Sequence, residues 1–365
     1  RRASRSVDVL IATPPCQGLS SSNPTRGKRR TGKAWRNAAK NRLLLDTIPL
    51  IQKLSPRVVI AENVRQVLTH RARNNGRVKT VPELLRYELP DYEVFTDTVN
   101  VADYGIPQIR RRAIIVAVHR DEPWLDSLLE HGLAPWPRAT HSEDGSDPDT
   151  EPWVSVKQWF KSMEYERLSS KTPKLATGTH ALHNVPSYDK DRYTLVSSIP
   201  KFTGRSAYEN DRCPSCDVVG VEASAAECPA CGEALTTRPI VHSKGRARLI
   251  KGFKSSYRRM HASRPASTVT TNSSHIGSDN KIHPWEHRVL SALECADLQT
   301  VPRFFKWDLA FESNRLYLIR NLIGEAFPPY FTYIHGAILR KLLSGARVSL
   351  SSLATDPSRR IRKIA

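Results

Sequence analysis

A short apolar run near the start of the chain, followed at once by two prolines, constrains the fold more than any other feature. Residues 7–12 are mostly β-branched or aliphatic, which predicts a buried strand of a parallel sheet. Pro14 and Pro15 lack a backbone N–H and force the chain out of the sheet. We therefore expect Cys16 at the carboxyl end of a strand, where open α/β sheets place their chemistry. A lone cysteine is usually a packed core residue, but this position favours a functional one.

A second strand is expected to end beside the first. Residues 42–54 have apolar side chains at a helical period, and Pro49 is expected to kink this helix or end it early. Residues 57–61 then predict another buried strand, which ends in Glu62. Strand, helix and strand form a βαβ unit, so Glu62 and Cys16 should lie at the same edge of the sheet.

The next segments predict a further helix and two more strands. A short helix is expected over residues 80–89, a strand over 92–101 and another over 113–118. Arg110 and Arg112, at the entry to the last strand, are expected on one face of it because side chains alternate along a strand. Two guanidinium groups there would hold a carbonyl oxygen or a phosphate, or raise the positive potential around a thiol.

The charge of the chain indicates a polyanionic partner. The 365 residues have a formal net charge of +20 and a pI near 9.9, which favours nucleic acid or an acidic membrane face. The sequence contains no run of 18 apolar residues, so it predicts no membrane span. The polar segment 18–40 is expected to be a mobile loop, and its cations are placed to close on a phosphate backbone. These cations are Arg26, Lys28, Arg29, Arg30, Lys33 and Arg36.

Four of the six cysteines form two C-x-x-C pairs, Cys213 with Cys216 and Cys228 with Cys231. Two such pairs at this spacing predict a structural, tetrahedral Zn²⁺ site in a reducing cytoplasm. Two disulfides, or a redox pair, are the alternatives. The basic residues that follow, in 244–259, alternate with aromatic ones, a pattern that favours contact with duplex DNA over a merely solvated face.

Five separated segments together resemble motifs of the DNA cytosine-5 methyltransferases, and they occur in the order found in that family. Three lie in the first third of the chain: Pro15-Cys16-Gln17, Glu62-Asn63-Val64 and Gln108-x-Arg110-x-Arg112. Two lie near its end: Arg264-Pro265 with Thr268 and Arg288 to Gln299, and then Gly324-Glu325-Ala326-Phe327-Pro328-Pro329. The family usually has Asn where this chain has Glu325.

The resemblance implies an assignment of roles. Cys16 would add as a thiolate to C6 of a cytosine that is flipped out of the duplex, Glu62 would hold N3, and Arg112, with Arg110 beside it, would hold the O2 carbonyl. These residue types suit the chemistry, because ring methylation needs a nucleophile and a place for the developing negative charge. Further contacts to the substrate are expected from Gln17, Asn63, Gln108, Arg29 and Arg30.

The methyl donor implied by the resemblance is S-adenosylmethionine. Positions that line the donor pocket in relatives are Pro15, Leu43, Glu325, Ala326 and Phe327. The glycine-rich first motif of the family is absent from this chain. We therefore expect a second polypeptide to supply it, or the chain to be part of a longer protein. A degenerate methyltransferase retained for DNA binding is the remaining explanation.

The sequence thus predicts a Rossmann-like class I methyltransferase sheet of the α/β class, lacking its N-terminal part, with an inserted target-recognition domain that contains a zinc ribbon. The expected divisions are a catalytic part over 1–120, the recognition domain over 121–262 with zinc knuckles at 213–231, the last motifs over 263–345 and a basic tail over 346–365. The expected function is cytosine-5 methylation of double-stranded DNA in bacterial restriction–modification or phage defence, in the cytoplasm at the nucleoid. The alternatives are a catalytically inactive, zinc-stabilised DNA-binding subunit of a larger complex and, third, an RNA methyltransferase.

Overall fold

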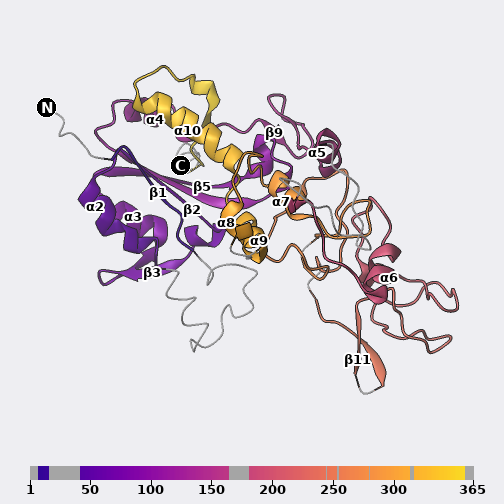
Figure 1. Cartoon of the computed structure of the whole chain (residues 1–365). Coiled ribbons are helices and arrows are strands. Elements are labelled where there is room, and N and C mark those ends of the chain that lie inside the picture. Colours follow the sequence, from indigo (N-terminus) through magenta and orange to yellow (C-terminus); the bar gives the residue numbers. More distant parts are fainter. Residues whose placement is uncertain are drawn as a thin grey trace. The chain divides into compact units, whose positions relative to one another are not determined.

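The computed structural model describes most of the chain (Figure 1), namely residues 7–15, 42–163, 181–243, 245–252, 255–278, 280–312 and 316–357. The chain divides into two compact units. The sheet unit consists of Arg1–Asn100, Arg111–Ala139 and Tyr333–Ala365, and the insertion unit of Val101–Arg110 and Thr140–Thr332. Residues 121–139 therefore group with the sheet, and 263–332 with the insertion, which differs from the segments expected from the motifs.

A four-stranded sheet in the order β1-β2-β7-β5 forms the centre of the sheet unit. β1 (Val9–Ala12) pairs in parallel with β2 (Val58–Asn63), which confirms the βαβ unit. β7 (Arg111–His119) runs antiparallel to β2 and to β5 (Tyr92–Asn100), so the sheet is mixed.

The first strand is less buried than the sequence predicts. Among the described residues β1 pairs on one side only, with β2, and the Ile11 side chain is 63 % exposed. The expectation of a fully buried strand in a parallel sheet was therefore wrong, because an apolar composition alone does not distinguish an edge strand from a central one.

Pro49 begins a helix instead of ending one. A 3-10 turn, η1 (Leu45–Thr47), leads into α2 (Ile48–Leu54), and Pro49 lies in the first turn of α2. There the missing N–H of proline costs nothing, because the first amides of a helix have no acceptor within it. α2 ends at Ser55, whose left-handed backbone (φ 44°) turns the chain into β2.

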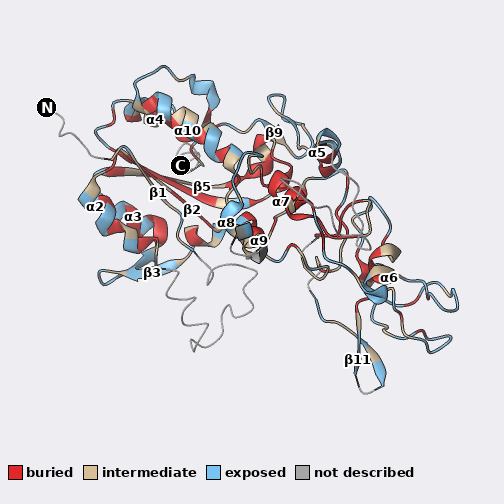
Figure 2. Ribbon diagram, viewed as in Figure 1, coloured by how far each residue is buried: buried red, intermediate tan, exposed pale blue. Residues whose placement is uncertain are grey.

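One face of the sheet is covered by α2 and by α3 (Val81–Glu88), which lie on the same side of it in Figure 1. α3 begins with a capping box, in which the Thr80 hydroxyl accepts from the Glu83 amide and the Glu83 carboxylate accepts from the Thr80 amide. The core on this face includes Ile51, Leu84 and Ile115. Figure 2 shows the buried side of both helices turned toward the strands.

The other face is covered by α4 (Leu125–Glu130), β8 (Leu133–Pro137) and α10 (Pro329–Leu343). Trp136 meets Phe95 of β5 edge to face, with ring centroids 6.5 Å apart. The Arg57 guanidinium donates to the Leu343 carbonyl at 3.0 Å, so the end of α10 lies beside the start of β2.

Part of the expected basic tail is ordered structure. A 3-10 turn, η6 (Leu350–Ser352), is followed by β14 (Leu353–Thr355), which pairs antiparallel with β8. Leu353 is buried in this pairing. The abundance of cations after residue 346 concealed a short apolar strand.

The remaining elements are short. In the sheet unit they are η2 (Arg65–Leu68), β3 (Arg71–Asn74) and β4 (Arg77–Thr80). In the insertion unit they are η3 (Val101–Tyr104), β6 (Gln108–Ile109), β9 (His141–Ser142), β10 (Glu151–Pro152), α5 (Val156–Ser162), α6 (Lys190–Ser198), η5 (Ala207–Glu209), β11 (Ile240–Ser243), β12 (Arg246–Leu249), β13 (Ala266–Ser267), α7 (Ala292–Leu298), α8 (Asp308–Glu312) and α9 (Leu316–Glu325). Across the described ranges, no helix is both long and apolar enough to cross a bilayer.

A buried ion pair organises the insertion unit around α7. Arg288 donates two hydrogen bonds to the carboxylate of Glu294, at 2.6 and 2.7 Å, and neither side chain is exposed by more than 1 %. Burial opposes the charge of Glu294, but Arg288 outweighs it and holds the pKa of that carboxyl well below its usual range. Cys295, on the same helix, is fully buried among apolar side chains. His283 is also buried, and its Nε2 lies 3.5 Å from Glu294, so it is part of this network.

Candidate active site

Glu62 and Arg112 form an ion pair at the carboxyl end of β2. Arg112 Nε lies 3.1 Å from Glu62 Oε1, and the two side chains are 18 % and 17 % exposed. The register explains the pairing: Glu62 is opposite Ile114, so Arg112 is its diagonal neighbour on the same face of the sheet. The sequence brought these two residues together only by motif, and the strand register now supplies the physical reason.

The environment of this pair differs from that of a surface ion pair. Burial lowers the pKa of Arg112, and the charge of Glu62 partly opposes that shift. The guanidinium stays charged nonetheless, because the ordinary pKa of arginine lies far above neutral pH. The arrangement therefore presents a fixed positive donor and a carboxyl group side by side, with enough exposure to reach a ligand.

The segment that leads to Cys16 is held against the same strand end. The Asn63 side-chain amide donates to the Pro14 carbonyl at 3.1 Å, and its oxygen accepts from the Val64 amide at 2.8 Å. Asn63 is 4 % exposed, so its predicted role in contacting a substrate is replaced by one in holding the exit from β1. Of the other predicted site residues, Cys16, Gln17, Arg29 and Arg30 lie outside the described part of the chain.

Arg110 does not share a strand face with Arg112. It lies between β6 and β7, is 1 % exposed and donates to the carbonyls of Val269 at 3.1 Å and Gly324 at 3.0 Å. These partners, with the Glu325 carbonyl at 3.4 Å, account for its burial. The expectation that period-2 geometry pairs the two arginines fails because residue 110 is not part of a strand.

Gln108 is likewise used inside the insertion unit. Its amide nitrogen donates to Gln299 Oε1 at 2.6 Å and to the Leu298 carbonyl at 3.0 Å, and its oxygen accepts from the Val269 amide at 2.9 Å. It is fully buried. The predicted substrate contact is therefore replaced by a link between β6, β13 and the end of α7.

The residues predicted to line a donor pocket fall in both units. In the sheet unit Pro15 is exposed and Leu43 half-buried; in the insertion unit Glu325 is exposed, and Ala326 and Phe327 are half-buried. A Cβ on Gly324 would lie 2.3 Å from the Thr271 amide nitrogen, so only glycine allows this close approach. These side chains offer apolar and aromatic surface, but Glu325 is the one hydrogen-bonding side chain among them, so alone they do not fit a donor with ribose, adenine and amino-acid groups.

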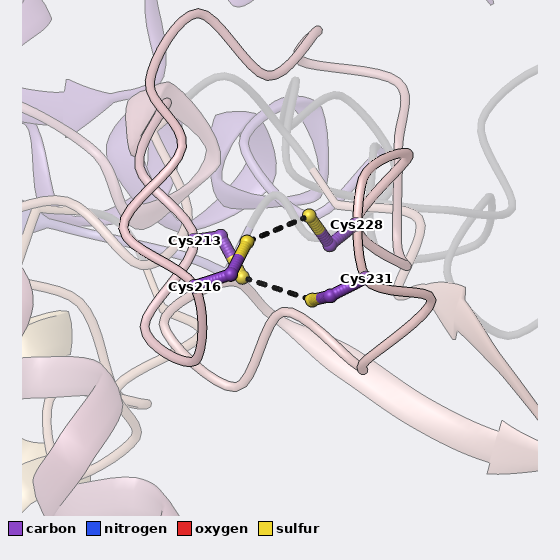
Figure 3. A group of neighbouring side chains, drawn as sticks. All are labelled: Cys213, Cys216, Cys228 and Cys231. Carbon is purple, nitrogen blue, oxygen red and sulfur yellow. Dashed lines mark hydrogen bonds between the residues drawn. The ribbon is translucent and has the colours of Figure 1, made fainter.

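The four knuckle cysteines converge as a metal site would require (Figure 3). All four sulfurs lie within 4.8 Å of one another, with Cys213 Sγ 3.8 Å from Cys231 Sγ and Cys216 Sγ 3.6 Å from Cys228 Sγ. Four thiolates at about 2.3 Å from a tetrahedral Zn²⁺ would lie about 3.8 Å apart, so the donor set fits this ion. The backbone amide of Cys216, followed by that of Ser215, favours the thiolate and lowers the pKa of Cys213 to about 6.

Buried cations of the insertion unit were missed by sequence reasoning. Arg259 is fully buried and donates to the carbonyls of Val196, Ile199 and His283, and burial lowers its pKa to about 10. Lys281, also fully buried, donates to Ser267 Oγ at 3.0 Å. The sequence placed Arg259 in a basic surface run, and no local pattern distinguishes a cation that binds carbonyls from one that binds phosphate.

The chain is an α/β protein, with helices packed on a mixed β-sheet. Its polar site is the carboxylate–guanidinium pair at the carboxyl end of β2, beside the Pro14-Pro15 exit from β1. The profile of the C-5 cytosine-specific DNA methylases matches residues 2–340. The chain belongs to that family.

The chain is also similar to individual proteins. The Type II methyltransferase M1.HgaI of Avibacterium volantium is 28 % identical over 338 residues, which cover 88 % of this chain and 76 % of that protein. The Type II methyltransferase M1.HphI of Haemophilus parahaemolyticus is 32 % identical over 113 residues, 31 % of this chain and 27 % of that protein. Among solved structures, S. pombe Dnmt2 methyltransferase aligns with 93 % of this chain and 78 % of its own, at 14 % identity and a TM-score of 0.43.

Proposed function

We propose that the protein is a DNA cytosine-5 methyltransferase that acts through a covalent Cys16 adduct, with S-adenosylmethionine as the methyl donor. The single observation that supports this most directly is the Glu62–Arg112 pair, 3.1 Å apart at the carboxyl end of β2, next to the segment that leads to Cys16. Family membership supplies the reaction class, and this geometry supplies groups suited to it.

In this proposal the Cys16 thiolate adds to C6 of the cytosine, which breaks the aromaticity of the ring and moves electron density to C5. Glu62 hydrogen-bonds at N3, and Arg112 donates to the O2 carbonyl, so both stabilise the charge that develops on the ring. C5 takes the methyl group from the donor's sulfonium. The donor's sulfonium thereby becomes a neutral thioether. A water molecule then takes the C5 proton, and departure of the thiolate restores the aromatic ring and frees Cys16.

The ion pair suits two adjacent atoms of one ring edge. N3 and O2 of cytosine are neighbours, and Glu62 and Arg112 already lie side by side with a common orientation. The positive charge of the Arg112 guanidinium also offsets the free-energy cost of partly burying the Glu62 carboxylate. Little rearrangement is needed for both groups to turn from each other to a base.

The target atoms lie inside a duplex, so the cytosine has to be flipped out. We assign closure over the flipped base to the basic segment 18–40, with Gln17, Arg29 and Arg30 as its substrate contacts. The net charge of +20 favours double-stranded DNA as the partner. The relatives named Type II methyltransferases favour a setting in bacterial restriction–modification, at the nucleoid.

Two further parts of the proposal concern bound groups. A Zn²⁺ ion held by Cys213, Cys216, Cys228 and Cys231 would stabilise the insertion unit without taking part in the reaction. For the methyl donor, we assign Pro15, Leu43 and residues 325–327 as part of the binding surface.

Trapping on 5-fluorocytosine DNA tests the mechanism. The fluorine at C5 cannot leave as a proton does, so an active enzyme supplied with donor stays covalently bound to its substrate. We expect a stable adduct with the wild-type protein and none with Cys16→Ala, while both bind DNA equally. Methylation by Cys16→Ala would refute the covalent mechanism. DNA binding without an adduct in the wild type, with every donor segment present, would favour the inactive DNA-binding subunit.

A further inference from the structure

The insertion unit contains a long stretch without negative charge. Between Glu233 and Asp279 the chain has no acidic residue. Its Lys and Arg residues there are Arg238, Lys244, Arg246, Arg248, Lys251, Lys254, Arg258, Arg259 and Arg264. Such a run is either a solvated face or a nucleic-acid surface. The burial and partners of each cation show which of them remain available to a ligand.

Three of these cations are occupied by the fold itself. Arg238 is 1 % exposed and donates to the carbonyls of Asn210, Val221 and Ala225 at 2.6–2.7 Å. Arg259 donates to backbone carbonyls as described above. Arg258 binds the Gly204 carbonyl and the Glu209 carboxylate. None of the three is available for a phosphate or a base.

Arg246 and Arg248 are exposed and share one face of the β11–β12 ribbon. Val241 pairs with Arg248 and Ser243 with Arg246, so these four side chains form the outer face. Within the described part of the chain, no carboxylate pairs with either guanidinium. The inner face carries Ile240 and His242 instead, and these line a cavity of about 440 Å³ together with Leu195 and Tyr257.

The ribbon is anchored to the cysteine knuckles both near its turn, through Ala247, and close to its base, through Arg238. The Ala247 amide donates to Glu227 Oε1 at 2.8 Å, and Glu227 directly precedes Cys228. Arg238, immediately before β11, holds the carbonyls of the loop between the two cysteine pairs. Figure 1 shows the ribbon extending away from α6, within the same unit. The knuckles therefore fix the direction of an element that would otherwise be a marginally stable hairpin.

The geometry points to the outer face of this ribbon, with Arg246 and Arg248, as the element that enters the major groove of duplex DNA and reads its bases. This inference rests on the proposed function and specifies how the DNA is recognised. The major groove is about 12 Å wide and admits a two-stranded ribbon. Residues two apart on a strand are about 6.8 Å apart, which is about two base-pair steps. Each arginine thus reaches a separate base pair, and arginine binds O6 and N7 of guanine with two hydrogen bonds.

The same chain offers a matched control ribbon. β3 and β4 form another two-stranded antiparallel ribbon, and Arg71 and Arg73 are exposed and two apart on β3, as Arg246 and Arg248 are on β12. The pair Arg71→Ala with Arg73→Ala removes the same charge from the same kind of element. Any effect of lost positive charge alone should be equal in both double variants.

The test selects bound sequences from a pool of random DNA duplexes, using the full-length wild type, each single variant Arg246→Ala and Arg248→Ala, and both double variants. Binding selection needs no methyl transfer, so its outcome is independent of the catalytic proposal. We expect a sequence motif with the wild type and the β3 control. Each single variant should lose preference at one position of that motif, with affinity for the selected duplex falling about tenfold or more.

Three results would overturn the inference. The first is that the ribbon variants keep the full motif and lose no more affinity than the β3 control, which would make Arg246 and Arg248 general phosphate contacts. Preferential binding of duplex RNA by the wild type would exclude major-groove reading, because that groove is too narrow in A-form helices. Unfolding of the ribbon variants, seen by hydrogen exchange at Ala247, would assign these arginines a structural role.

Discussion

At the scale of single residues, Glu62 and Arg112 differ from the other polar residues of the motifs because their side chains remain partly exposed. Asn63, Gln108 and Arg110 are buried and hydrogen-bonded to the protein. A motif therefore contains two kinds of residue: partly exposed ones, which we propose meet the substrate, and buried ones, which hold the segment in place. Mutation should separate them.

Replacing Glu62 with Gln should reduce the rate of methyl transfer by about 10²–10⁴-fold, because an amide cannot supply the proton or the charge at N3. DNA affinity and stability should change little, since the amide can still accept from Arg112. Single-turnover methylation of a cognate duplex measures the rate. Glu93→Gln is the control, because Glu93 forms an exposed ion pair with Arg120 on the same sheet. A full rate with Glu62→Gln would remove this residue from the mechanism.

Arg110→Ala should instead lower the free energy of unfolding by about 2–4 kcal/mol, because it leaves buried carbonyls at Val269 and Gly324 without a donor. Arg112→Ala should cost less stability and abolish activity. Urea denaturation of both variants, with activity assayed where each is folded, compares the two effects. An Arg110 variant of native stability that lacks activity would support the catalytic role expected from the sequence.

The fate of Arg110 shows what local sequence cannot predict. Its spacing from Arg112 matches a strand face, but its partners lie 159 and 214 positions further along the chain. Nothing within a few residues of 110 indicates those contacts. The Glu62–Arg112 pair was anticipated from the motifs alone, and the register of β2 with β7 supplies its physical reason.

At the scale of elements, the strands and helices with a clear apolar period were predicted well. Helix ends and very short strands were predicted less well. The β1–α2–β2 unit, α3 and β5 lie where periodicity placed them. Pro49 was expected to kink or end a helix, because proline disrupts a helix interior. It instead lies in the first turn of α2, where proline is well tolerated. β14 was hidden because three residues are too few to show a period.

The element most dependent on one interaction is α7. Glu294→Gln should destabilise the insertion unit by about 3 kcal/mol or more, because it leaves the buried Arg288 charge without its bidentate partner. The low pKa of Glu294 means that the wild-type pair persists to strongly acidic pH and is lost only as pH falls through that value. Hydrogen exchange within residues 288–298 measures the effect.

A matched change elsewhere in the unit provides the comparison. Glu209→Gln breaks an exposed ion pair with Arg258, in which the Glu209 side chain is 40 % exposed. We expect it to cost less than about 1 kcal/mol. Equal losses in the two variants would mean that burial of the Arg288–Glu294 pair does not matter.

At the scale of the whole molecule, neither unit is continuous in sequence. The sheet unit uses the start, the middle and the end of the chain, and the insertion unit takes Val101–Arg110 from between two strands of the sheet. Motif order gave the family correctly, but it could not give these boundaries, because compactness depends on contacts between distant segments. The clearest case is residues 263–332, which were expected in the segment of last motifs and group with the insertion unit.

Folding of the sheet unit should depend on pH through His335 of α10. This side chain is 4 % exposed, and its Nε2 donates to the Pro135 carbonyl at 3.0 Å. Burial lowers its pKa to about 4, whereas an unfolded histidine titrates near 6.5. Between these two values the unfolded chain binds a proton that the folded chain does not, so stability falls as pH falls, by about 1.4 kcal/mol per pH unit. Above the unfolded value the effect is absent.

His335→Gln should flatten this dependence, because the amide keeps a donor for Pro135 and does not titrate. Urea unfolding of wild type and variant between pH 7.5 and 4.5, followed by hydrogen exchange within α10, compares the slopes. We expect the curves to converge at acidic pH, where the wild type has lost the contribution of a neutral histidine. Parallel curves would show that His335 titrates alike in the folded and unfolded states, which would contradict its burial in the folded protein.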